Sequence, residues 1–284
     1  MKNGSFFVPA DKIANFVKIG RMNAQEGIYA AWQTKMEVLE KVLPKPLVPI
    51  APIVQVYIVN IQNPTFTSRY GEGAIAVPVT CNGVPGAYFF SFLLDGPGAQ
   101  MGTVLGRECL GIPKKLASKI LVERAGDQVT AYIERHGIRL ITIEMEVGQY
   151  NNPAAKDIFN DPAPDSKESL DCIFYKYDIV QDEKGKMNFV DGRVTAVQFD
   201  VYHKMWEPGT AKIAMQPSFE DPWAELEVVE VLGAGWAQRD IDLCVKTRVL
   251  TKVDATEAMQ YLYSARFDRG AINEPEKRYT TDMA

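Results

Sequence analysis

Histidine and cysteine are scarce in this chain of 284 residues, which holds two histidines and four cysteines. The cysteines stand at positions 81, 109, 172 and 244, far apart and without a Cys-x-x-Cys pair. The sequence therefore predicts neither a disulfide framework nor a zinc site. Because His136 and His203 are the only histidines, a histidine-rich metal site is not expected either, and we predict no metal.

Several common catalytic signatures are also missing. The chain has no Gly-x-Ser-x-Gly nucleophile elbow, no Gly-x-Gly-x-x-Gly dinucleotide loop and no Walker phosphate loop. A Ser-His-Asp or Cys-His enzyme would have to use one of the two histidines. If the protein is an enzyme, lysine and carboxylate chemistry is the main option left, and that chemistry requires no cofactor.

Neither a strong charge imbalance nor a long hydrophobic run is present. The net charge is −5 with 24% charged residues, so no basic excess suggests a nucleic-acid partner. The longest apolar runs, around residues 53–59 and 87–94, are too short to cross a bilayer. The N-terminus has no signal-peptide hydrophobic region behind Phe6-Phe7-Val8. We expect a cytoplasmic globular protein with no membrane or nucleic-acid partner.

Strand patterns dominate the sequence. Residues 53–60 are apolar on both faces, as in a fully buried strand, and a turn at 82–86 joins strands expected at 74–80 and 87–94. Further strands are expected at 120–123, 128–134, 138–147, 193–202, 226–232 and 243–250. Since strands and helices do not alternate, we predict a mainly β (α+β) fold, an antiparallel β-barrel or folded sheet with a few helices.

Two helices and a single domain are predicted. Thr34 to Glu37 have the pattern of a capping box, and Asp254 opens a second helix. Residues 151–169, rich in Pro, Asp and Asn, are typical of a long surface loop, but strand patterns continue beyond them. We therefore expect one domain over residues 1–284, with 1–20 and 271–284 as peripheral terminal segments.

The most informative segment is Gly106-Arg-Glu-Cys-Leu-Gly-Ile-Pro-Lys-Lys-Leu116, in which Lys114 and Lys115 are adjacent. Burial disfavours a charged ammonium group, and a second cation nearby disfavours it further. A lysine that is neutral near pH 7 can attack a carbonyl carbon. Most lysine pairs are solvated surface charge, but the apolar neighbours and the Gly111-Ile112-Pro113 bend favour a reactive lysine here.

This segment resembles the reactive-lysine signature of the acetoacetate decarboxylases. Residues 70–79, continuing through Asn82-Gly83-Val84, resemble the segment that carries an active-site glutamate in that family. Residues 39–47 resemble its N-terminal helix and the exit from that helix. The order of elements is compatible from about residue 34 to residue 250. The resemblance implies the family's antiparallel barrel, usually assembled into homo-oligomers.

Three catalytic roles follow from the resemblance, position by position. It implies that Lys114 is the Schiff-base lysine, that Lys115 is its cationic neighbour and that Glu72 is the acid–base carboxylate. The alternative interpretation of Glu72, which stands between two glycines, is a surface turn residue.

Two positions depart from the decarboxylase pattern. Gln25 stands where the family has an arginine, and Tyr57 stands where it has a second glutamate. Both changes remove a charge that could handle a substrate carboxylate or departing carbon dioxide, so imine chemistry is better supported than decarboxylation. We predict that Gln25, Tyr57 and Ile112 bind substrate, although a tyrosine on a buried strand is more often part of the core.

An imine on Lys114 would act as an electron sink for several reactions. The favoured hypothesis is a carbon–carbon lyase acting on a small keto acid, by default decarboxylating an acetoacetate-like β-keto acid. One alternative is an aldolase or dehydratase-type lyase acting on a 2-keto acid through the same lysine. The other is a non-catalytic ligand-binding barrel that has kept the architecture without the chemistry.

Overall fold

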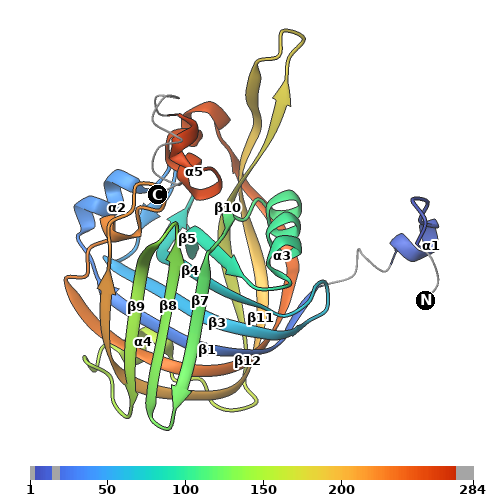
Figure 1. The fold of residues 1–284 in the computed structure, drawn as a ribbon. Coiled ribbons are helices and arrows are strands. Elements are labelled where there is room, and N and C mark those ends of the chain that lie inside the picture. The colour runs from blue at the N-terminus through green and yellow to red at the C-terminus, as the bar shows by residue number, and fades with distance from the viewer. Residues whose placement is uncertain (1–3, 15–19, 273–284) are drawn as a thin grey trace.

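The computed structural model describes residues 4–14 and 20–272 (Figure 1). Parts of the predicted peripheral segments, 1–20 and 271–284, therefore lie outside the described residues. No helix in the described part of the chain is long and apolar enough to cross a membrane.

Long strands and short helices make up the described chain. The helices are α1 (Ala10–Ile13), α2 (Met36–Val42), α3 (Ala99–Leu105), α4 (Ala155–Phe159) and α5 (Ala255–Arg266), with a π-helical turn η1 (Gly106–Leu110) and 3-10 turns η2 (Trp223–Glu225) and η3 (Arg269–Ala271). The strands are β1 (Arg21–Gln33), β2 (Val48–Pro49), β3 (Ile53–Pro64), β4 (Tyr70–Cys81), β5 (Val84–Asp95), β6 (Lys114–Leu116), β7 (Lys119–Ala125), β8 (Gln128–Arg135), β9 (Ile138–Val147), β10 (Lys167–Gln181), β11 (Met187–Met215) and β12 (Glu230–Lys252).

The described strands form one mixed sheet. Its order is β10-β5-β4-β3-β1-β12-β11-β9-β8-β7, with β2 paired to β4 and β6 paired to β5. Because β10 pairs with both β5 and β11, the path of pairings from β10 through β1 to β11 returns to its start. The pairs are antiparallel except β5–β10 and β5–β6. The predicted mainly β, largely antiparallel folded sheet with few helices is confirmed, and the two parallel pairs are additions that hairpin patterns do not predict.

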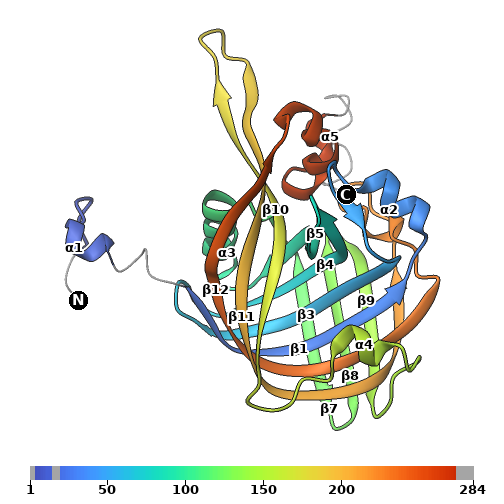
Figure 2. The ribbon, with the colours of Figure 1, turned by 180° about the vertical axis from the view of Figure 1, so that it is seen from behind.

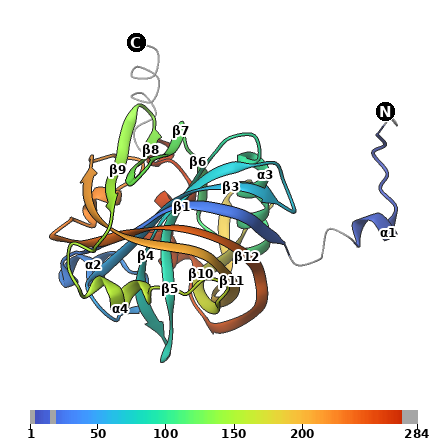
Figure 3. The same cartoon turned by 90° about the horizontal axis from the view of Figure 1, so that it is seen from below.

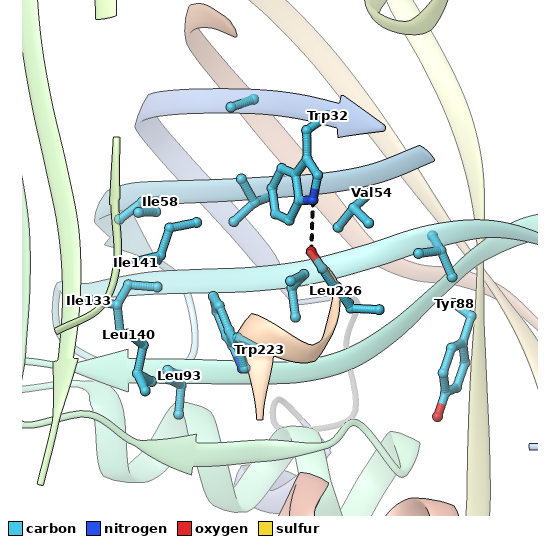
Figure 4. Packing of buried hydrophobic residues seen from close by; sticks show 14 of the residues in the cluster. Trp32, Val54, Ile58, Tyr88, Leu93, Ile133, Leu140, Ile141, Trp223 and Leu226 are labelled. Carbon is cyan, nitrogen blue, oxygen red and sulfur yellow. Dashed lines mark hydrogen bonds between the residues drawn. The ribbon is translucent and has the colours of Figure 1, made fainter. Parts of the chain in front are cut away.

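Strand β3 is covered on both faces, but it is fully buried on one of them only, because Gln55 and Tyr57 on the other face are half-buried. Successive side chains point to opposite faces of a strand. Val54 and Ile58 belong to the larger hydrophobic core, whereas Val59 and Ile61 belong to a smaller cluster. Figure 4 shows the larger core, which also contains Ile141 of β9.

The sheet folds over itself, so that the two clusters lie on opposite faces of its central strands. Strands β7, β8 and β9 cross one face of β1, β3 and β4, and the larger core fills the space between them (Figures 1 and 3). Strands β10, β11 and β12 curve round the other side (Figure 2). The smaller cluster therefore lines the hollow that these strands enclose.

The ends of two predicted elements differ from the structure. Helix α2 begins after Lys35, and no side chain caps it, so the predicted capping box is wrong. The Thr34 amide instead donates to the carbonyl of Pro52. The strand predicted at 226–232 begins at Glu230, because Leu226 lies in a turn where its carbonyl accepts the Trp32 indole N–H at 2.9 Å (Figure 4).

Other boundaries agree with the sequence. The observed β9 has the bounds predicted for a strand at 138–147. Asp254 caps α5, accepting hydrogen bonds from the amides of Thr256 and Glu257, as predicted. The predicted loop at 151–169 contains the short helix α4 and ends inside β10.

Candidate active site

A cavity of about 1360 Å³ lies on the face of the sheet that carries the smaller hydrophobic cluster. Its walls come from β1, β3, β4 and β5 and from β10, β11 and β12, and the segment from Gly102 to Lys114 lines it as well. The apolar lining includes Met22, Phe89, Phe92, Phe174 and Ile241. Small-molecule sites usually measure about 300–1,000 Å³. This cavity can therefore hold a ligand much larger than an acid of a few carbons.

Lys114 enters the cavity from the short strand β6. The segment before it leaves α3 through the π-helical turn η1, and such turns are frequent at functional sites. Gly111 ends the turn with φ 74°, and a Cβ there would lie 2.8 Å from the carbonyl oxygen of Tyr175. Phe92 then donates its amide to the carbonyl of Pro113 at 2.8 Å, which fixes β6 in parallel register beside β5. The predicted bend at Gly111-Ile112-Pro113 therefore directs the Lys114 side chain into the cavity.

Gly106 provides the room that the Lys114 side chain occupies. A Cβ at position 106 would lie 2.7 Å from Cδ of Lys114 and 2.8 Å from its Cε. Any side chain at position 106 would therefore push the Lys114 stem out of its place, and glycine leaves that place free. This glycine belongs to the sequence segment that carries the family resemblance, but its function is visible only in three dimensions.

Lys114, Glu72 and Tyr57 form a hydrogen-bonded trio in the cavity wall. The Lys114 ammonium donates to Oε2 of Glu72 at 2.9 Å, and the Tyr57 hydroxyl donates to Oε1 of the same carboxylate at 2.8 Å. Glu72 is only 2% exposed, which excludes its interpretation as a surface turn residue. Burial, followed by the charge of Glu72, raises the pKa of Tyr57 well above its ordinary value, so Tyr57 remains a donor. The trio combines an amine, a carboxylate and a fixed hydrogen-bond donor.

Lys115 lies on the other face of β6, because neighbouring residues of a strand point in opposite directions. Its ammonium is 2.5 Å from Asp221 and 3.4 Å from Asp268, and it donates to the carbonyl of Glu220 at 3.1 Å. It is absent from the cavity lining. The expectation that the Lys115 ammonium adjoins that of Lys114 is therefore corrected, because two carboxylates hold it on the far side of the strand.

Arg135 completes the charge cluster around Lys115. Its guanidinium donates to Asp221 at 2.8 Å and to Asp268 at 2.9 Å. Burial pushes the pKa of Asp268 upward, but the hydrogen bond from Arg135 and the charges of Arg135 and Lys115 outweigh it, and the pKa falls to about 2. Two cations and two carboxylates thus join β6 and β8 to the chain around Asp221 and to the end of α5.

The other predicted site residues reach the cavity. Gln25 of β1 is buried and accepts a hydrogen bond of 2.7 Å from the hydroxyl of Tyr29. Ile112, two residues before Lys114 in the sequence, lines the cavity. Of the six predicted residues, the cavity lining therefore contains Lys114, Glu72, Tyr57, Gln25 and Ile112. Their roles in catalysis or binding stay predictions.

Two polar residues of the cavity wall, Tyr29 and Arg239, are not predicted from the sequence. His203, which stands at a predicted strand end where it could line a pocket, lies in the wall as well. The ring of Tyr29 lies 5.5 Å from that of Tyr57. Tyr29 and Gln25 are four residues apart on one strand and therefore share a face. That spacing is a usable signal, but the polar residues of β1 obscure its strand pattern.

The described residues contain no group of three or more His, Cys, Asp or Glu side chains that could hold a metal ion. Cys172 and Cys244 line the cavity as free thiols. Burial raises the pKa of the Cys244 thiol to about 11, so this thiol is not a thiolate near neutral pH. Among the described residues, the lysine–carboxylate pair is the candidate centre for chemistry.

Fold and site together define a class of protein: a mainly β chain whose folded sheet encloses a large apolar cavity with a buried lysine–carboxylate pair. The family model for "Acetoacetate decarboxylase (ADC)" matches residues 6–253. The chain belongs to the acetoacetate decarboxylase family, which confirms the resemblance.

Members of this family carry more than one named activity. A CLA biosynthesis isomerase of Lactiplantibacillus plantarum is 36% identical over 277 residues, covering 97% of this chain and 99% of that protein. An acetoacetate decarboxylase of Clostridium acetobutylicum is 25% identical over 230 residues, covering 78% and 86%. The crystal structure of an acetoacetate decarboxylase from Legionella pneumophila superposes with a TM-score of 0.69 at 19% identity, covering 83% of this chain and 88% of that one. Membership supports an enzyme but does not fix its reaction class.

Proposed function

We propose that the protein is a Schiff-base isomerase, in which Lys114 forms an imine with a ketone on an apolar chain and Glu72 moves a proton beside it. The observation that carries this proposal is the volume of the cavity, about 1360 Å³. A four-carbon keto acid fills on the order of 100 Å³, judged from about 30 Å³ per water molecule. The small keto acid expected from the sequence would leave most of the cavity empty, whereas a longer apolar ketone would occupy more of it and contact more of its apolar lining.

The first half of the proposed reaction forms the imine. The proton that Lys114 shares with Glu72 passes to the carboxylate, and the freed amine attacks the carbonyl carbon. One proton of the attacking nitrogen moves to the carbonyl oxygen, which gives the neutral carbinolamine. Glu72 then returns that proton to the carbinolamine hydroxyl, and water leaves. The resulting iminium withdraws electrons from the neighbouring carbon, and the carboxylate of Glu72 is again a base.

The second half moves a double bond. Glu72 removes a hydrogen from the carbon next to the iminium of a β,γ-unsaturated ketone, and the electron pair forms a dienamine. Glu72 delivers the same proton to the γ-carbon, which restores the iminium with the double bond in conjugation, and water then hydrolyses it. Tyr57 holds Glu72 in place through the other carboxylate oxygen. The isomerase relative at 36% identity supports this reaction class.

Decarboxylation of a β-keto acid is the second candidate, and the similarity to decarboxylases favours it. The same iminium would accept the electrons that departing carbon dioxide leaves behind. Gln25 and Tyr57 stand against it, because neither supplies the charge found in the decarboxylase pattern. The aldolase and dehydratase alternatives use the same lysine, but no contact in the cavity favours them.

The test compares two substrates on the same protein. Oct-4-en-2-one should convert to its conjugated isomer, followed by the ultraviolet absorbance of the enone, and octan-2-one should exchange its α-hydrogens in deuterated water. Lys114→Met should abolish both reactions, and Glu72→Gln should slow them by roughly 100-fold, as expected for loss of an acid–base group. Lys35→Met, which changes an exposed lysine outside the cavity, is the matched control.

Two outcomes would overturn the isomerase proposal. Release of carbon dioxide from acetoacetate without isomerisation of the enone, dependent on Lys114, would select the decarboxylase. Absence of any Lys114-dependent exchange, together with retained ligand binding, would select the non-catalytic binding protein.

A further inference from the structure

One wall of the cavity carries a row of three polar side chains. Arg239 of β12 pairs directly with Gln25 of β1 on one side and with His203 of β11 on the other. Directly opposed residues of antiparallel strands put their side chains on the same face of the sheet. All three residues line the cavity, so the row faces the ligand space.

Arg239 is a buried cation with no anionic partner among the described residues. It is 9% exposed, its Nε makes no hydrogen bond, and no carboxylate lies within ion-pairing distance of it. Four other arginines, Arg21, Arg124, Arg135 and Arg248, are paired with carboxylates. Arg266, which stacks on Tyr177, also has a buried nitrogen without a hydrogen bond, but it does not line the cavity. The contrast with Arg135, equally buried but bonded to two aspartates, shows what Arg239 lacks.

The contact of Arg239 with Tyr29 supplies only part of what a buried charge needs. The guanidinium lies 3.7 Å from the centre of the Tyr29 ring, in cation–π geometry. Burial, opposed by the charge of Arg239, raises the pKa of Tyr29 to about 12, so the ring offers no negative charge. An unpaired buried charge is costly, and a planar guanidinium is matched best by a carboxylate that accepts two hydrogen bonds.

We propose that Arg239 is a carboxylate-binding subsite, which holds the acid group of the molecule whose carbonyl reacts at Lys114. The proposal rests on the proposed function, because it assigns the far end of the same substrate. A chain of contacts joins the two ends of the site: Arg239 stacks on Tyr29, whose ring centre is 5.5 Å from that of Tyr57, and Tyr57 bonds the carboxylate that Lys114 also bonds. The substrate class is therefore an oxo-carboxylic acid in which an apolar chain separates the acid from the carbonyl.

The neighbours of Arg239 in the row suit this role. Gln25 uses its amide oxygen to accept from Tyr29, which leaves its N–H donors for a ligand. Neither ring nitrogen of His203 makes a hydrogen bond, and its Nε2 lies 3.4 Å from a carboxylate oxygen of Glu168. Glu168 is the acidic group that contacts the row, and its side chain is 40% exposed, so water solvates its charge. Asp171, which also lines the cavity, is paired with Arg248.

The subsite also accounts for the missing arginine at position 25. The decarboxylase pattern has an arginine there, whereas this chain has a glutamine. Arg239 is the cross-strand partner of Gln25, so the guanidinium is displaced by one strand, about 5 Å. A positive charge is thus retained in the cavity but moved along its wall.

The test uses ligands that cannot form an imine. Decanoate and decanamide have the same shape and differ in charge, and isothermal titration calorimetry gives the Kd of each. The intact protein should bind decanoate at least tenfold more tightly than decanamide. Arg239→Gln should weaken decanoate binding by at least tenfold and change decanamide binding by less than about twofold, since a charged hydrogen-bonded pair is lost in the first case alone.

Two further variants separate binding from folding. Gln25→Arg combined with Arg239→Gln moves the guanidinium one strand back and should restore most of the preference for decanoate. Arg139→Gln is the matched control, because it removes an exposed arginine that lies 4.0 Å from the ring of Tyr132, outside the cavity. It should leave both Kd values unchanged. If Arg239→Gln does not fold, the test uses the preference for decanoate over decanamide in the intact protein and in Gln25→Leu. Gln25→Leu removes a neighbouring donor, and its preference should be a few-fold smaller than that of the intact protein.

Equal affinity of the intact protein for the two ligands, or equal weakening of both by Arg239→Gln, would overturn the subsite and leave Arg239 a packing residue on Tyr29. Failure to bind either ligand would overturn it as well. A preference for decanoate together with no Lys114-dependent exchange of octan-2-one would keep the subsite and reject the proposed function. Lys114-dependent exchange of octan-2-one without a preference for decanoate would keep the proposed function and reject the subsite.

Discussion

Lys114 and Lys115 are neighbours in the chain, yet the two faces of β6 place them in different surroundings. Lys114 faces the large cavity and meets one carboxylate, Glu72, together with apolar walls. Lys115 faces the packed side and meets Asp221 and Asp268, which Arg135 also binds. One lysine has open space beside it for a ligand, and the other has its charge fully matched by the protein.

One dipeptide thus places one lysine in the cavity, where we propose the chemistry, and the other in a buried ion cluster. A strand of three residues, held by its parallel pairing with β5, is enough to separate the two ammonium groups. We infer that the apolar cavity, rather than a neighbouring ammonium, sets the reactivity of Lys114. Variants that change one side of β6 at a time separate the two environments.

Lys114→Met should have the largest effect. Loss of the nucleophile should lower the initial rate of oct-4-en-2-one isomerisation by at least ~10³-fold, as for nucleophiles in other covalent enzymes. Thermal unfolding and initial rates of the purified protein measure stability and activity separately. Rates within tenfold of the intact protein would contradict the assignment of chemistry to the cavity side.

Lys115→Met should act on stability instead. Removing one partner of a buried ion cluster leaves buried carboxylate charge less compensated, which costs about 3 kcal/mol of unfolding free energy. Urea unfolding measures it. Lys35→Met, which breaks the exposed pair with Glu227, is the control and should cost less than about 1 kcal/mol.

The folded fraction of Lys115→Met should keep its activity within about fivefold, because the cavity is unchanged. A fivefold change in rate corresponds to about 1 kcal/mol of activation free energy. A pH–rate profile that moves strongly in this variant would mean that the charge of Lys115 does reach Lys114 across the strand.

Gly106→Ala should disturb the cavity side without changing any charge. The new methyl group would displace the Lys114 stem from its place 2.7 Å away, and misplacement of a reacting group by about 1 Å lowers the rate roughly 100-fold. Gly102→Ala, in α3 one turn earlier, meets Leu94 rather than the lysine and is the control. Equal rates for the two alanine variants would contradict the steric account.

The smallest effect is expected from the pH dependence of the packed side. The folded-state pKa of Asp268, about 2, lies below its ordinary value of 3.8. The charged form is therefore favoured by folding, and its contribution is present above about pH 4 and is lost as the pH falls toward 2. Urea midpoints between these limits should fall more steeply for the intact protein than for Asp268→Asn. Parallel curves would contradict the assignment.

Much of the fold is predictable because a continuous apolar run marks a strand covered on both faces, and apolar alternation marks a strand with one face toward solvent. β3 shows the first pattern, β9 shows the second, and α5 is marked by Asp254 at its N-cap. β1 is missed because Asn23, Gln25 and Glu26 interrupt its alternation. The polar residues that obscure the strand include one that lines the cavity.

Only those residues of the candidate site that belong to a linear motif are predictable from the sequence. The motif locates Lys114, and the resemblance locates Glu72, whose contact comes from β4. The position of Lys115 depends on strand alternation within β6, an element too short to recognise in the sequence. Arg239 depends on the register between β1 and β12, which lie some two hundred residues apart and share no local signal.

The most direct test of the account is borohydride reduction of the protein in the presence of octan-2-one, followed by fragment-ion mass spectrometry of the peptide around β6. The account predicts one secondary-amine adduct, located on Lys114, with Lys115 unmodified. An adduct on Lys115, or equal labelling of both lysines, would contradict the claim that Lys114 alone presents a reactive amine to the cavity.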